Sequence, residues 1–88
     1  MKVLVLYHPN AEFARMVEQY ARDFERSQGD SLELMSLESR DGADMARLYD
    51  VVQYPALLAI NERDKSLARL WQGEKLPLMS EVASYARR

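Results

Sequence analysis

The chain has 88 residues, 48% of them hydrophobic, and 12 Lys and Arg against 14 Asp and Glu, for a formal net charge of -2. This length allows one compact domain, and we expect residues 1–88 to form it. The absence of cysteine excludes disulfides, thiolate metal sites and cysteine nucleophiles. His8 is the single histidine, which excludes a multi-histidine metal site within one chain. We expect no metal site and no cofactor. The charge gives no reason to expect a nucleic-acid partner.

The first predicted element is a strand over residues 2–7. This run is apolar on both faces, which is typical of a central strand covered on both sides. It is too short to span a membrane or to form the core of a signal peptide. We therefore expect a cytoplasmic protein that does not associate with membranes.

A helix is predicted next, from Phe13 to just before Gly29. Apolar residues recur with a spacing near 3.6 up to Phe24, charged residues occupy the opposite face, and Gly29 is placed to end the helix. Asn10 is a residue type that commonly caps a helix N-terminus. A short strand is predicted over residues 32–37, because turn residues flank this brief apolar run.

A second helix is predicted to begin near Asp41 and to end before Pro55, since the residue preceding a proline avoids the helical region. Four apolar residues at helical spacing predict its buried face: Met45, Leu48, Tyr49 and Val52.

Two further strands, over residues 56–60 and 67–71, flank a charged turn and predict a hairpin. Pro77 fits the first turn of a last helix. The apolar face of that helix is expected to consist of Leu78, Val82, Tyr85 and Ala86.

The predicted order β-α-β-α-β-β-α indicates an α/β protein with three α/β/α layers and a mixed four-stranded sheet. A right-handed crossover should make the first two strands parallel, whereas the hairpin strands run antiparallel. Because the first and third strands are apolar on both sides, helices should cover both faces of the sheet.

This order resembles that of the thioredoxin fold, and three segments carry the resemblance. Residues 7–14, Tyr-His-Pro-Asn-Ala-Glu-Phe-Ala, are similar to the loop and helix start where thioredoxins and glutaredoxins place Cys-x-x-Cys. Residues 51–57, Val-Val-Gln-Tyr-Pro-Ala-Leu, are similar to the segment in which a cis proline opens the third strand. Residues 71–73, Trp-Gln-Gly, are similar to the glycine-terminated strand before the last helix. The resemblance covers the whole chain.

The resemblance implies that Ala11 and Ala14 stand where the family keeps its two cysteines, so that thiol redox chemistry is absent. The remainder would be a vestigial active-site loop formed by His8, Pro9, Asn10, Ala11 and Ala14. In family members the residue before the cis proline pairs its backbone with an extended peptide or with glutathione. Tyr54 and Pro55 would then form a peptide or ligand groove. Alternatively, the proline serves only the turn into the strand.

We expect a redox-inactive, monomeric binding or adaptor module that recognises a protein or peptide and is not an enzyme. An alternative is an enzyme-like protein that binds glutathione or another small thiol and uses the Tyr7 hydroxyl in place of a cysteine. A third alternative is a structural subunit of a larger complex. His8 is either a general base or anion contact, or a loop histidine that packs locally. No Ser or Asp stands at a spacing that suggests a triad, which favours the local role.

Overall fold

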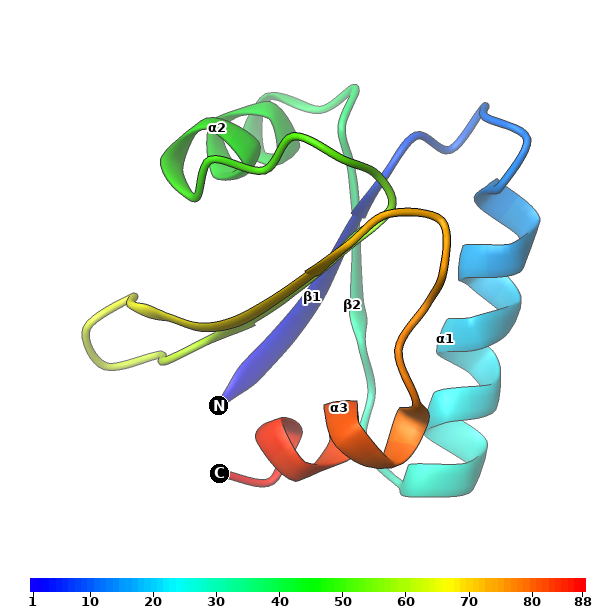
Figure 1. Ribbon diagram of the computed structural model, residues 1–88, viewed down its shortest axis with the longest axis vertical. Coiled ribbons are helices and arrows are strands. Elements are labelled where there is room, and N and C mark those ends of the chain that lie inside the picture. Colours follow the sequence, from blue (N-terminus) through cyan, green and yellow to red (C-terminus); the bar gives the residue numbers. More distant parts are fainter.

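The computed structural model describes every residue from Met1 to Arg88. Four strands and three helices follow one another in the predicted order (Figure 1). The elements are β1 Lys2–Tyr7, α1 Ala14–Gln28, β2 Glu33–Ser36, α2 Arg40–Leu48, β3 Ala56–Ile60, β4 Leu67–Gln72 and α3 Met79–Ala86.

The strands form one mixed sheet in the order β2-β1-β3-β4. β1 pairs parallel with β2, placing Leu4 opposite Glu33, and antiparallel with β3, placing Leu4 opposite Leu58. β3 and β4 form an antiparallel hairpin. β1 and β3 occupy the middle of the sheet and are buried throughout except at Lys2, which accounts for sequences that are apolar on both faces.

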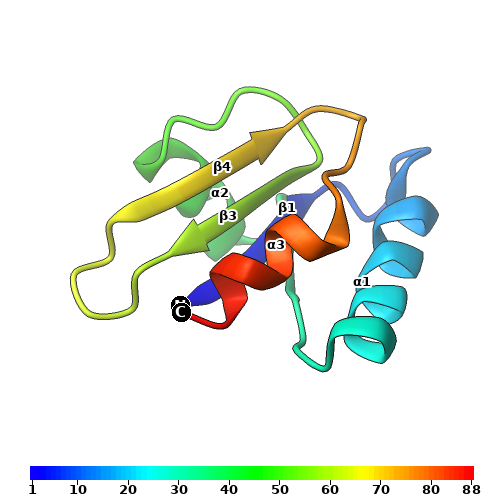
Figure 2. The same cartoon turned by 60° about the horizontal axis from the view of Figure 1, so that its bottom comes forward.

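Helices cover both faces of the sheet, as predicted. α1 and α3 lie on one side and α2 on the other (Figures 1 and 2). On the first side Val5 and Leu57 of the sheet pack with Phe24 of α1 and Val82 of α3. On the second side a smaller cluster packs against α2; its buried members are Leu4, Leu6, Ala46, Val51, Ala56, Leu58 and Ile60. The predicted α/β class with three layers is therefore confirmed.

α1 begins at Ala14, and the cap predicted at Asn10 was wrong. Two successive turns separate Asn10 from the helix, closed by the N–H of Ala11 bonding to the His8 carbonyl and that of Ala14 to the Ala11 carbonyl, at 3.0 and 3.1 Å. The Asn10 amide instead donates to the Glu38 carboxylate at 3.2 Å. The other end matches the prediction, since Gly29 terminates α1 with a positive φ of 81°.

α2 begins one residue before the predicted start, at Arg40, and Ser39 is its N-cap. The Ser39 hydroxyl accepts from the Gly42 N–H at 3.0 Å and donates to the Ser36 carbonyl at 2.7 Å. These two bonds join the first turn of α2 to the end of β2.

The apolar face predicted for α2 was partly wrong. The helix ends at Leu48, and Asp50 adopts a positive φ of 55°, so the chain turns away before a further helical turn can form. Leu48 and Val52 are each 69% exposed, although helical spacing placed them in the core. Met45 and Tyr49 pack against the second core cluster as predicted, and Ala46 is a buried member of that cluster.

α3 begins at Met79, so Pro77 precedes the helix and is not in its first turn. Leu78 is 74% exposed, whereas Val82 and Ala83 are fully buried against the sheet. The hydroxyl of Tyr20 donates to the Pro77 carbonyl at 2.7 Å and ties this connection to α1. None of the three helices has both the length and the apolar character needed to cross a bilayer.

Candidate functional site

Three connections meet at one end of the sheet. Leu6, next to the end of β1, pairs with Ala56 at the start of β3, and Ala56 also pairs with Gln72 at the end of β4. The segments after β1, before β3 and after β4 therefore lie together, as Figure 1 shows. These segments contain most of the residues that the sequence singled out.

Tyr54 is at the centre of this end. The peptide bond between Tyr54 and Pro55 is cis. The imidazole of His8 meets the Tyr54 ring edge to face, with centroids 5.5 Å apart and planes at 78°. The Tyr54 hydroxyl donates to the Val51 carbonyl at 3.1 Å. His8 is exposed, and its ring makes an edge-to-face contact with Tyr54.

The end of β4 holds the segment that precedes β3. The side-chain Oε1 of Gln72 accepts from the N–H groups of Val52 and Gln53, both at 3.2 Å. The N–H of Gly73 donates to the Pro55 carbonyl at 3.0 Å. Polar groups on both sides of Tyr54 are thus bonded within the chain.

The backbone of Tyr54 itself is different. Neither its N–H nor its carbonyl makes a hydrogen bond within the chain. Most backbone polar groups in folded proteins have a partner, either within the chain or in water. Because Tyr54 is only partly buried, its two groups are available to solvent or to a bound segment.

A small apolar pocket of about 40 Å³ lies beside Tyr54. Six of its eight lining residues are hydrophobic, and the eight come from β1, the following loop, α1 and the segment before β3. They are Tyr7, His8, Ala11, Phe13, Ala14, Val17, Tyr54 and Pro55.

Two broader and more open hollows adjoin Tyr54. One, of about 440 Å³, faces α2 and is lined by His8, Leu37, Ala43, Ala46, Arg47, Asp50, Val51 and Tyr54. The other, of about 410 Å³, adjoins the end of β4 and is lined by Gln53, Tyr54, Gly73 and Glu74. Tyr54 therefore contributes to all three cavities at this end of the molecule.

The structure brings together five of the residues predicted for the site and leaves two outside it. His8, Ala11, Ala14, Tyr54 and Pro55 line the apolar pocket. Pro9 and Asn10 line none of the three cavities, and Asn10 bonds to Glu38 instead. Sequence reasoning missed two pocket residues, Phe13 and Val17. Their spacing of four residues on the apolar stripe predicted from Phe13 to Phe24 was the available signal.

Tyr7 also lines the apolar pocket, and its hydroxyl already makes a hydrogen bond within the chain. The hydroxyl donates to the Glu18 carboxylate at 3.2 Å. Burial raises the pKa of Tyr7, and the hydrogen bond to Glu18 and the negative charge of that carboxylate raise it further. A hydroxyl that activates a bound thiol should accept the thiol proton or stabilise the thiolate. The environment of Tyr7 favours the neutral phenol, and the hydroxyl proton is already donated to Glu18. Both observations argue against that role.

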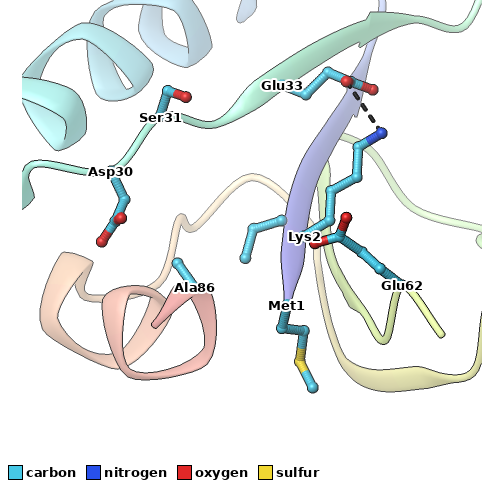
Figure 3. Close-up of a pocket in the computed structure, with 8 residues that line it drawn as sticks. Met1, Lys2, Asp30, Ser31, Glu33, Glu62 and Ala86 are labelled. Atoms are coloured by element: carbon cyan, nitrogen blue, oxygen red, sulfur yellow. Dashed lines mark ion pairs between the residues drawn. The ribbon is translucent and has the colours of Figure 1, made fainter. Parts of the chain in front are cut away.

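An open hollow of about 490 Å³ lies at the opposite end of the sheet, where β1 begins (Figure 3). Lys2 crosses it to pair with Glu33, with Nζ 3.2 Å from Oε1, and both side chains are 45% exposed. Asp30, also on its wall, pairs with Arg87. Such exposed pairs contribute little energy, and they leave few groups free for a ligand. We therefore place the candidate site at the Tyr54 end.

No protein-family model and no curated protein matches the sequence. Solved structures do match the fold. Thioredoxin 1 from the thermophilic eubacterium Thermosipho africanus superposes with a TM-score of 0.65 at 9% identity, over 99% of this chain and 91% of that one. A structure described as a malarial protein gives a TM-score of 0.58 at 12% identity, over 99% of this chain and 96% of that one. The chain therefore has a thioredoxin-like fold, and it has no cysteine.

Proposed function

We propose that the protein is a redox-inactive thioredoxin-fold module that binds an extended peptide segment of a partner protein at Tyr54. The observation that carries the proposal is the unpaired N–H and carbonyl of Tyr54 beside an apolar pocket. An extended segment would bond to these two groups as a short added strand. The adjoining pocket would then take one of its side chains.

The size of the pocket suggests which side chain it takes. A single water needs about 10–15 Å³ of free cavity volume, so a pocket of about 40 Å³ accommodates about three waters or three heavy atoms. That is the size of the branched part of a Val side chain. Since the pocket is lined mainly by hydrophobic residues, a small apolar residue such as Val is the anchor we propose.

Exposed apolar residues beside the groove support an interaction surface here. Leu48, the last residue of α2, and Val52, in the connection from α2 to β3, are each 69% exposed. Their chain neighbours Arg47 and Gln53 line the two broader hollows. Large apolar side chains that flank a cavity often mark a protein-binding surface. A partner longer than the peptide segment would cover both.

Redox inactivity follows from what occupies the first turns after β1. In the thioredoxin resemblance, Ala11 and Ala14 stand at the two cysteine positions, and a methyl group cannot form a thiolate. The alternative that uses Tyr7 in place of a cysteine has less support, because that hydroxyl is bonded to Glu18 and its pKa is raised. The expected monomeric state and cytoplasmic location stay predictions.

An NMR titration tests the proposal. The ¹⁵N-labelled protein is titrated with the pentapeptide Gly-Ala-Val-Ala-Gly, blocked at both ends, to millimolar concentration. We expect saturable amide shifts at Tyr54, His8 and Ala11. The Ala11→Leu variant fills the pocket and should lose the shifts. Ala68→Leu, the same change at an exposed β4 position, should keep them. A lack of shifts at Tyr54, or equal binding by both variants, would contradict the proposal.

A further inference from the structure

Two carboxylates flank Tyr54 without a basic partner. Asp50 lines the hollow on the α2 side of Tyr54, and Glu74 lines the hollow on the β4 side. Both residues are exposed, and the five ion pairs of the chain involve neither of them. The side chains of Asp50 and Glu74 also make no hydrogen bond within the chain.

The cations near these carboxylates do not neutralise them. Arg47 shares the α2-side hollow with Asp50, but its guanidinium pairs with Asp44. Lys75 follows Glu74 in sequence and does not line the β4-side hollow. A segment lying across Tyr54 therefore meets one uncompensated negative charge in each of the two hollows beside the apolar pocket.

We propose that the segment bound at Tyr54 carries Lys or Arg on both sides of its apolar anchor. This inference rests on the proposed function and names the class of peptide. Successive residues of an added strand point to opposite faces, so the two neighbours of the anchor both point away from the apolar pocket and lie on either side of the anchor along the strand. Cationic side chains there would pair with Asp50 and Glu74, whereas acidic ones would be repelled. The partner is therefore a basic segment with a small apolar residue at its centre.

The test compares three pentapeptides, blocked at both ends, that share a central Val. They are Gly-Lys-Val-Lys-Gly, Gly-Gln-Val-Gln-Gly and Gly-Glu-Val-Glu-Gly, titrated at low salt with the Tyr54 amide shift as the readout. We expect the Lys peptide to bind about fivefold more tightly than the Gln peptide, from two exposed pairs. We expect the Glu peptide to bind more weakly than both. Raising the salt concentration should reduce these differences.

Paired variants identify the carboxylates responsible. Asp50→Asn combined with Glu74→Gln should make the Lys and Gln peptides equal. Glu62→Gln removes an exposed carboxylate at the opposite end of the sheet and should leave the preference unchanged. Equal binding of the three peptides at Tyr54, or a Lys preference that survives the double substitution, would overturn this inference and leave the proposed function standing. Failure of every peptide to shift Tyr54 would overturn both.

Discussion

The close contact between α2 and β2 predicts that Gly42→Ala strongly destabilises the protein. A Cβ added there would lie 1.9 Å from the Ser36 carbonyl oxygen and 2.8 Å from the carbonyl carbon. Both are backbone atoms at the end of a strand, so neither can rotate away as a side chain does. Gly42→Ala must therefore push the first turn of α2 away from β2. The movement would break the bond from the Gly42 N–H to the Ser39 cap.

The magnitude follows from three contributions. Forcing an extra methyl group into a packed contact costs about 1–3 kcal/mol, and we take the upper part of that range because the clash is severe. Losing the Ser39 cap costs about 1 kcal/mol. Replacing a helical Gly by Ala stabilises the helix by about 1 kcal/mol, which offsets part of these losses. The net loss is about 3 kcal/mol, against a total stability of roughly 4–13 kcal/mol for 88 residues.

Urea unfolding followed by circular dichroism measures this loss. With a slope of roughly 1–1.5 kcal/mol per molar urea, the midpoint of Gly42→Ala should fall by about 2–3 M. Gly29→Ala is the matched control, since a Cβ there meets nothing within 4 Å and only the positive φ of 81° opposes it. It should cost about 1 kcal/mol. If Gly42→Ala is as stable as the parent protein or more stable, the contact is wrong and helix propensity alone governs the site.

Three further predictions concern other parts of the chain. Burial raises the pKa of Tyr20 to about 12, with the charge of Glu81 as a second cause. The stabilising contribution of this tyrosine is therefore complete below pH 10 and is lost as the pH rises through about 12. Absorbance titration should show Tyr20 ionising late, and Tyr20→Phe should remove that phase and cost about 1 kcal/mol through the lost bond to Pro77. The turn from Ala11 to Ala14 is closed by a 3.1 Å hydrogen bond, so Ala11→Cys with Ala14→Cys should form an intrachain disulfide in air, seen by mass spectrometry, and lack of oxidation would contradict this turn. Lys65 has a positive φ of 63°, so Lys65→Gly should raise the thermal midpoint by relieving about 1 kcal/mol of strain, whereas a lower midpoint would show that there was no strain to relieve.

Much of the fold could be predicted because the pattern of single elements determines it. The central strands β1 and β3 are apolar on both faces, and only a sheet covered on both sides buries such runs. The hairpin of β3 and β4 follows from two short apolar runs around a charged turn. These features need no knowledge of long-range contacts.

The errors fall where a tertiary contact or an irregular turn overrides the local pattern. Asn10 has the chemistry of a cap, but two turns separate it from the helix and its amide reaches Glu38 instead. Leu48 and Val52 fit a helical stripe, but the positive φ of Asp50 turns the chain before that stripe is complete. Periodicity cannot reveal where a helix stops when no Gly or Pro marks the position.

The candidate site was predictable in outline and not in detail. The resemblance indicated Tyr54, Pro55 and the loop after β1, and the structure brings His8 and Ala11 to the same pocket. The unpaired backbone of Tyr54 directly follows two N–H groups, of Val52 and Gln53, that bond to the Gln72 side chain at the end of β4. Such bonds between distant parts of the chain leave no pattern in the sequence.

Hydrogen exchange at the Tyr54 amide tests whether a bound peptide pairs with this part of the backbone. In the free protein this N–H has no acceptor within the chain and should exchange rapidly. With the Lys-containing pentapeptide at saturation, we expect exchange at Tyr54 to slow markedly, because the peptide carbonyl accepts its hydrogen. The amide of Glu62, at the opposite end of the sheet, should keep its rate. Saturable peptide binding with an unchanged exchange rate at Tyr54 would contradict the claim that the peptide pairs with this backbone.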